Sequence, residues 1–362
     1  MCEFLSYFRD LEDPRQLGKV WYSLEEILLV SLCAVMAGCD DWEEIAAFGE
    51  AKLDFFRQVL PFETGIPSAN TFRRLFEILN PVVFQECFVR WVQAMCEAMP
   101  GVVAVDGKTL RQSFSKENKA LHMVSAFCVE NKMVLGQRRS DEKSNEITAI
   151  PALLAMLDIQ GMTITIDAMG CQTKIAQQIL DQNADYILAL KGNQGGLNDD
   201  VRLWFSDPLA SEKSHFYQNI DKDHGRIETR SVRVSSDIEW LKARHDWPGL
   251  ESIIEVASVR EISGQSTSEK RFYISSLKDS PKQFLGKIRS HWAIENSLHW
   301  MLDMVFNEDK NRSRKDHSPE NFAILRHMAL NLIRKNKNPK KSIKVTRKSI
   351  GWNETQFFKF LS

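Results

Sequence analysis

The sequence lacks several features that would place it in a specialised class of protein. Its seven cysteines are scattered and include no Cys-x-x-Cys pair, so neither a zinc site nor a disulfide framework is indicated. The longest apolar run, from Ile27 to Gly38, is too short to cross a bilayer. The N-terminal stretch has no signal-peptide layout, and the chain contains no internal repeat or low-complexity segment. We therefore expect a soluble cytoplasmic protein with reduced cysteines and no membrane partner.

Net charge is also small, but it is unevenly distributed. The 362 residues carry a net charge of −1, and 43% are hydrophobic, which is ordinary for a chain long enough for two or three domains. Residues 331–350 hold eight Lys or Arg and no acidic residue, which leaves the rest of the chain acidic. A basic segment on an acidic body suggests a polyanionic partner. Lys340 and Lys341, in this segment, are candidate contacts to nucleic acid.

Residues 1–100 are predicted to form an all-α N-terminal domain. The third of its predicted helices, over 68–79, is short, follows a Gly-Ile-Pro turn and carries Arg73 and Arg74. Such a helix is compatible with a helix-turn-helix that reads DNA. A plain helical bundle explains the same pattern, and these residues alone favour the bundle.

After Gly101 the pattern changes to short apolar runs and to period-two alternation, which predicts an α/β fold. Asp106 and Asp167 each end a predicted strand, where α/β folds commonly hold their ligands. If the first and fourth strands are neighbours, the two aspartates lie side by side. The predicted strands cover 102–105, 121–129, 133–137, 162–166 and 186–190.

A β-rich insertion is predicted over 195–285, because charged and β-branched residues alternate there between turn residues. It carries His224, Arg226 and Arg230, which we expect to contact DNA if they are exposed. Glu228 could instead pair with one of these arginines.

Helical periodicity then returns over 287–314. His291, Glu295, His299 and Asp303 follow one another at intervals of four residues, which places them on one helix face. An apolar stripe runs beside them. Trp292 and Trp300 flank that stripe, and we expect both in the core.

Three carboxylates are thus candidates for one metal site: Asp106, Asp167 and Glu295. Oxygen-only clusters suit Mg²⁺ or Mn²⁺, and two such ions about 4 Å apart could activate a nucleophile and stabilise the leaving oxygen of a phosphodiester. Asp303, on the same helix face as Glu295, is the strongest rival for the third acid. An aspartate at a strand end is common, so neither aspartate carries weight alone.

Six segments, in order, resemble the insertion-sequence transposases of the ISAs group, which includes the H-repeat-associated proteins and belongs to the DDE superfamily. The resemblance implies an RNase H-like catalytic core that is interrupted by a β-rich insertion and preceded by a helical domain. It places the catalytic acids, which are also the metal ligands, at Asp106, Asp167 and Glu295. The segments are VDGKTLRQS at 105–113, EKSNEITAIPALL at 142–154, ITIDAMGCQ at 164–172, DYILALKGNQ at 185–194, HGRIETR at 224–230 and RSHWAIENSLHWMLDMVFNED at 289–309.

The same resemblance implies partners and cofactors. These are two Mg²⁺ or Mn²⁺ ions, double-stranded DNA in the form of terminal inverted repeats and target DNA, and a homodimer or larger assembly on that DNA. The expected location is the bacterial cytoplasm, at the nucleoid.

One departure from related transposases lies on the helix that carries the glutamate. Where they place Tyr, Arg, Glu and Lys, this chain has Ile288, His291, Glu295 and Leu302. His291 could still donate to a phosphate, though less strongly than Arg. His299 or Lys310 could take the place of the lysine. Other expected phosphate contacts, for which ordinary loop charge is an equal alternative, are Lys108, Arg111 and Lys191.

The sequence therefore predicts a DNA transposase that hydrolyses a phosphodiester at the ends of its element and directs the freed 3′-hydroxyl at target DNA. A metal-dependent nuclease without strand transfer and a non-catalytic DNA-binding relic or regulator remain alternatives. A two-carboxylate glycosidase is disfavoured by the basic tail and by the lack of aromatic-rich loops near the acids. The predicted parts are a helical N-terminal domain for DNA-end binding (1–100), the first part of the core (101–194), the insertion (195–285), the C-terminal core helices with the catalytic Glu (286–335) and a basic tail (336–362).

Overall fold

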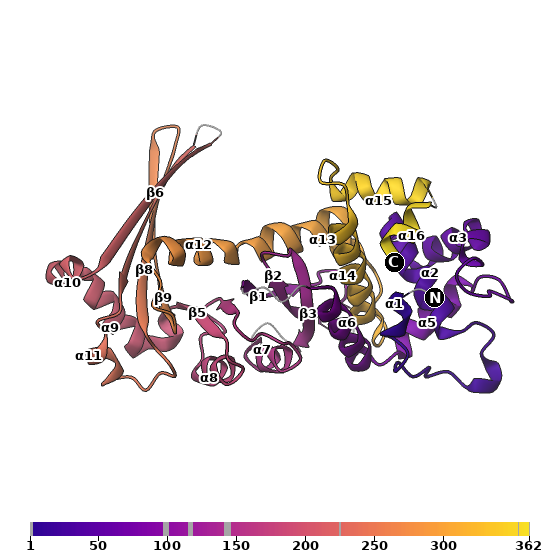
Figure 1. Cartoon of the computed structure of the whole chain (residues 1–362), viewed down its shortest axis with the longest axis horizontal. Helices are drawn as coiled ribbons and strands as arrows, with labels where there is room; N and C mark the ends of the chain where they lie inside the picture. The colour runs from indigo at the N-terminus through magenta and orange to yellow at the C-terminus, as the bar shows by residue number, and fades with distance from the viewer. Residues whose placement is uncertain are drawn as a thin grey trace.

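The computed structural model describes residues 3–96, 101–114, 119–140, 146–223, 226–353 and 355–361. The molecule is elongated, with the N-terminal helices gathered at one end and long β-hairpins at the other (Figure 1). Both ends of the chain lie among those helices (Figure 1). Within the described ranges, no helix is both long enough and apolar enough to span a membrane.

The described residues before 97 form helices. These are α1 (Glu3–Ser6), α2 (Leu24–Ala37), α3 (Trp42–Ala51), α4 (Leu53–Phe56), α5 (Ala69–Ile78) and α6 (Pro81–Met95). Helix α2 begins at a capping box in which Ser23 and Glu26 bond each other's backbone N–H, and it is buried on every side. Glu26 also accepts a hydrogen bond from the N–H of Phe62 at 2.7 Å, which anchors the loop before α5 to the start of α2.

The α/β part is built on five strands and two helices. These are β1 (Val102–Thr109), β2 (His122–Cys128), β3 (Met133–Ser140), α7 (Glu146–Leu154), β4 (Thr163–Ile166), α8 (Thr173–Asp181) and β5 (Asp185–Leu190). β1 pairs with β4 in parallel, with Val105 opposite Ile166, so the first and fourth strands are neighbours as expected. The sequence predicts that the first strand ends at Val105. β1 instead continues to Thr109, because β2 pairs with it as far as that residue. Asp106 therefore lies where β1 loses its parallel neighbour but keeps its antiparallel one. Ser144 and Asn145 are residue types that cap helices, so the sequence predicts that a helix opens there; both lie outside the described residues.

The insertion opens with helices and then extends the same sheet. Its elements are α9 (Gly195–Ser206), α10 (Pro208–Glu212), β6 (His215–Asp223), β7 (Arg226–Ser235), α11 (Glu239–Lys242), β8 (Ser252–Ile262) and β9 (Gln265–Ser275). β9 pairs antiparallel with β5, so one mixed sheet has the strand order β3-β2-β1-β4-β5-β9-β8-β7-β6. α9 was not predicted because its first six residues include two glycines, an asparagine and two aspartates, which are weak helix formers.

The helices after the sheet complete the fold. These are α12 (Pro281–His291), a π-helical turn (Ile294–His299), α13 (Trp300–Val305), α14 (Ser318–Asn336), α15 (Ile343–Trp352) and α16 (Thr355–Leu361). The run from α12 to α13 lies along one side of the sheet, opposite α7 and α8 (Figure 1).

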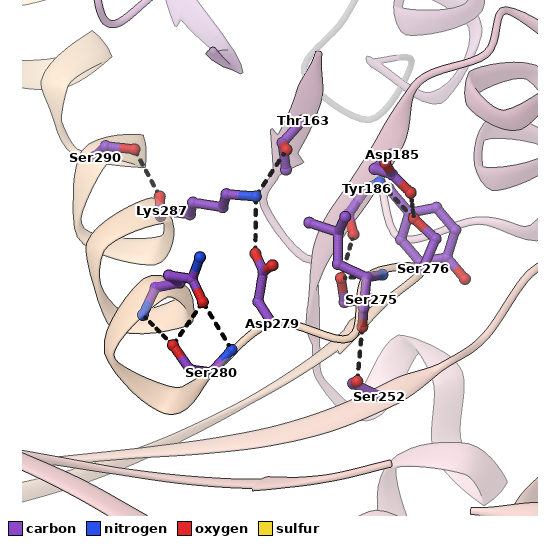
Figure 2. A network of polar contacts seen from close by, with 12 residues as sticks. Thr163, Asp185, Tyr186, Ser252, Ser275, Ser276, Asp279, Ser280, Lys287 and Ser290 are labelled. Atoms are coloured by element: carbon purple, nitrogen blue, oxygen red, sulfur yellow. Dashed lines mark hydrogen bonds and ion pairs between the residues drawn. The ribbon is translucent and has the colours of Figure 1, made fainter. Parts of the chain in front are cut away.

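Polar side chains join the insertion to the core at the start of α12 (Figure 2). Ser276, just after β9, donates to Asp185 at 2.8 Å. The ammonium of Lys287 lies 2.8 Å from a carboxylate oxygen of Asp279 and donates to the hydroxyl of Thr163 on β4 at 3.2 Å. These contacts fix the direction in which α12 leaves the sheet.

Residues 336–362, predicted as a basic tail, largely form helices that pack on the N-terminal end of the molecule. α15 contacts α2, and α16 contacts α14. Arg347 is only 4% exposed; its guanidinium donates to the carbonyl of Val35 and lies 4.1 Å from the ring centre of Phe306. Arg347 is thus a buried structural residue and cannot meet a polyanion. Lys340 and Lys341, in the loop before α15, are exposed.

Candidate active site

The three predicted carboxylates line one cleft of about 550 Å³, which lies where the parallel strands β4 and β5 end. Asp106 comes from β1, Asp167 directly follows β4, and Glu295 belongs to the π-helical turn. Because β1 and β4 are parallel neighbours, the two aspartates emerge from adjacent backbones. The helix that crosses the sheet brings the glutamate opposite them.

The segment that carries Glu295 is not the continuous α-helix that was predicted. α12 ends at His291, and in the π-helical turn the N–H of Trp300 donates to the carbonyl of Glu295, five residues back. π-turns recur at functional sites. The wider turn changes the register of later side chains, so the predicted four-residue stripe does not continue to Asp303.

Electrostatics around Asp106 favour a nearby cation. Burial raises the pKa of the Asp106 carboxyl to about 7; His299 opposes this shift, and the negative charge of Glu295 adds to it. The pKa of Glu295 is lowered, chiefly by its interaction with His299. Two acids in such proximity repel each other when both are ionised, and a divalent ion would remove that repulsion.

Asp167 is oriented by the backbone of the loop that follows β4. One of its carboxylate oxygens accepts from the N–H of Met169 at 2.9 Å and from that of Gly170 at 3.4 Å. The loop is held in turn by Asn193, whose amide donates to the carbonyl of Ala168 at 2.6 Å. Asp167 therefore faces the cleft from a pre-arranged turn.

The donor atoms suit a divalent metal ion. Asp106, Glu295 and His299 each offer one ligand atom, and the three atoms lie within 4.8 Å of one another. Asp167 adds a carboxylate on the same cleft. Carboxylate oxygens are the ligands that Mg²⁺ and Mn²⁺ prefer.

Two predicted phosphate contacts face inward instead. The ammonium of Lys108 is 12% exposed and lies between Asp303 and Glu308, 2.6 Å from the latter. This position does not suit a phosphate contact, because Lys108 neutralises the buried Glu308 and the half-buried Asp303. His291 has Nδ1 3.0 Å from the hydroxyl of Thr165, and burial lowers its pKa, which weakens it as a phosphate donor.

The remaining predicted contacts differ in exposure. Arg230 is held by Asp221 at 2.6 Å and by Glu228 at 2.5 Å, as the alternative reading of the insertion allowed. His299 is 7% exposed and faces Asp106 and Glu295, not the surface. His224 lies outside the described residues. The exposed members are Arg73, Arg74, Arg111, Lys191, Arg226, Lys340 and Lys341.

Two tryptophans lie where the sequence did not predict them, and a group of arginines near them was not predicted. Trp292 is 47% and Trp300 55% exposed, so neither is a core residue; they lie just before and just after the π-helical turn, and both face solvent. The guanidinium of Arg271 lies 5.1 Å from the ring centre of Trp292. Both line a second hollow beside the cleft, together with Arg260 and Arg289. The available signal was that β7, β8 and β9 each carry arginine within stretches of alternating pattern.

Comparison with known proteins identifies the family. The protein-family model described as transposase DDE domain matches residues 97–332. A second family model, described as DDE_Tnp_1-associated, matches residues 5–92. The chain belongs to the transposase DDE domain family. The "Putative transposase YncI" of Escherichia coli O157:H7 is 42% identical over 357 residues, which cover 96% of this chain and 92% of that protein.

A second relative carries the H-repeat-associated name that the sequence motifs suggested. The "H repeat-associated putative transposase YhhI" of Escherichia coli K12 is 41% identical over 346 residues, covering 92% of this chain and 91% of that protein. The resemblance to the H-repeat-associated group is therefore confirmed. A solved piggyBac transposase synaptic complex with hairpin DNA aligns with a TM-score of 0.41 and 12% identity over 96% of this chain and 75% of that chain, a level that carries no weight here.

Proposed function

We propose that this protein is a DNA transposase that cleaves and joins phosphodiester bonds at a metal site formed by Asp106, Asp167 and Glu295. The observation that carries the proposal is their convergence on one cleft from three distant parts of the chain. When bound, two Mg²⁺ or Mn²⁺ ions would activate the attacking hydroxyl and neutralise charge on the phosphate. The protein's own part is to hold the carboxylates and to position the DNA.

On this proposal, the strands β1 to β5 form an RNase H-like core, and residues 195–285 are an insertion in it. Residues 286–335 complete the core and carry the catalytic Glu295. Three antiparallel strands, β1 to β3, followed by two parallel crossovers, to β4 and to β5, support that reading. The helices of residues 1–100 would bind the element ends. Arg73 and Arg74 lie exposed on α5, which supports their assignment to that surface.

The DNA path would run from the cleft into the adjoining hollow, between α12 and the face of β7 to β9. Arg226, Arg260 and Arg289 line that hollow and offer guanidinium groups to phosphates. Lys191 lines the cleft itself and is exposed. Since strand transfer needs two element ends, we expect a homodimer or larger assembly on DNA.

The test is a cleavage and joining assay. Purified protein would be incubated with Mg²⁺ or Mn²⁺ and with DNA that carries the element's terminal repeats, and both nicked and joined products would be scored. We expect both products, and we expect neither from Asp106→Asn, although that variant should still bind the ends. Nicks without joined products would instead identify a nuclease, and end binding without nicks a regulator.

A further inference from the structure

His299 occupies a place that a DNA contact could not use. It ends the π-helical turn and is 7% exposed. Its Nδ1 lies 3.7 Å from a carboxylate oxygen of Asp106 and 3.7 Å from one of Glu295. Both distances are longer than a hydrogen bond, so the ring faces the two acids without bonding to either.

These separations suit a shared ion. Metal–ligand bonds of about 2.1 Å put neighbouring donors roughly 3 Å apart and opposite donors roughly 4.2 Å apart in an octahedral site. The three donor atoms lie within 4.8 Å of one another, so small side-chain rotations would close them on one ion. The DDE acids alone would supply oxygen, whereas this arrangement adds one imidazole nitrogen.

The other ring nitrogen points to the same role. Among the described residues, Nε2 of His299 has no hydrogen-bond partner, nor do both amide atoms of Gln137 and Nδ1 of His327. All three residues line a buried cavity of about 10 Å³, on the sheet side of the helix, together with Ser125. A cavity of about this size can hold one water, and a water there would accept the N–H of Nε2 and donate to the neighbours.

An imidazole that binds a metal presents one unprotonated nitrogen to the ion and donates its other N–H to a polar group. We propose that His299 is a metal ligand through Nδ1, held in that tautomer by the polar cavity behind Nε2. This inference rests on the proposed metal site and adds to it a nitrogen donor. Because Mg²⁺ is a hard cation bound through oxygen, whereas Mn²⁺ belongs to the transition-metal series, an imidazole ligand biases the site against Mg²⁺ and toward Mn²⁺.

The experiment measures Mn²⁺ binding to the full chain without DNA, by calorimetry and by pulsed electron paramagnetic resonance. We expect the unaltered protein to show the ¹⁴N modulation of a directly bound imidazole. His299→Gln should lose that signal and bind Mn²⁺ about tenfold or more weakly. His291→Gln, the matched change at the histidine eight residues earlier, should keep the signal.

The outcomes separate this inference from the proposed function. A protein that binds Mn²⁺ with no ¹⁴N modulation, or one that loses the modulation in His291→Gln, overturns the role of His299 and leaves the acid site standing. If Asp106→Asn and Glu295→Gln bind Mn²⁺ as tightly as the unaltered protein, the metal site itself is wrong. Should His299→Gln fail to fold, the signal of the unaltered protein and its persistence in His291→Gln still decide.

Discussion

Glu295 and Asp303 lie on the same helical segment, but their surroundings differ. Glu295 is half exposed and faces Asp106 across the cleft. Asp303 is bonded to Lys108, which also neutralises the fully buried Glu308. The first acid is free to bind an ion, and the second is committed to an ion pair.

Substitution should separate the two acids. Glu295→Gln removes an anionic oxygen that a hard cation needs, so we expect cleavage to fall by orders of magnitude with little change in stability. Asp303→Asn weakens a half-buried ion pair and should cost about 1–3 kcal/mol in the free energy of unfolding, while cleavage largely survives. Denaturant titration and the cleavage assay measure both. The reverse pattern would reassign the third acid to Asp303.

Gly107 follows Asp106, so a side chain at this position would point to the opposite side of the sheet. There Nε2 of His122 lies 2.6 Å from a carboxylate oxygen of the buried Glu146. A Cβ at this position would overlap both side chains. We expect Gly107→Ala to lower the free energy of unfolding by about 1–3 kcal/mol. Gly286→Ala is the matched control, because nothing lies near its Cβ and alanine favours the helix. Equal unfolding midpoints for the two variants would contradict this account.

At the scale of elements, the sequence predicted the parts of the site that depend on local pattern. Short apolar runs located β1, β4 and β5, and the acids Asp106 and Asp167 followed from the runs of β1 and β4. That β1 and β4 lie side by side did not follow from the pattern, because strand pairing is a long-range property. The motif resemblance assigned Glu295 where periodicity alone left Asp303 as a rival.

Elements that depend on their surroundings were not predictable in this way. The π-helical turn has no sequence signature, and a regular stripe of four-residue spacing reads as plain α-helix. The contact of Trp292 with Arg271 of β9 joins segments distant in the sequence, which the helix sequence does not encode. Lys108 was open to two interpretations, a phosphate contact or ordinary loop charge, because its partners Asp303 and Glu308 lie about 200 residues later in the chain.

The capping box at the start of α12 should contribute measurably to stability. The hydroxyl of Ser280 accepts from the N–H of Gln283, whose side chain in turn accepts from the N–H of Ser280 (Figure 2). Ser280→Ala should cost about 1 kcal/mol in the free energy of unfolding. Ser290→Ala, in the same helix, removes only a bond to the carbonyl of Lys287 and should be near neutral. A larger loss for Ser290→Ala in thermal unfolding would contradict the capping role.

For the whole molecule, the basic stretch near the C-terminus is part structural and part exposed. Arg347 is buried against α2, whereas Lys340 and Lys341 reach solvent. We expect Lys340→Gln with Lys341→Gln to weaken DNA binding alike on all sequences, and to reduce the slope of log affinity against log salt by roughly 0.9 for each lysine that contacts phosphate. Lys174→Gln, exposed on α8, should leave the slope unchanged. An unchanged slope in the double variant would show that this loop does not meet DNA.

The packing of α15 and α16 on the N-terminal helices has a consequence for how the protein is made. α2 leaves the ribosome early, but the side chains that cover it, among them Arg347 over the carbonyl of Val35, are translated long afterwards. Phe357 of α16 lies 5.3 Å from the ring of Phe55 and 5.9 Å from that of Phe48. The N-terminal helices therefore cannot complete their core during elongation, and a nascent or prematurely terminated chain would expose that apolar surface to chaperones and proteases.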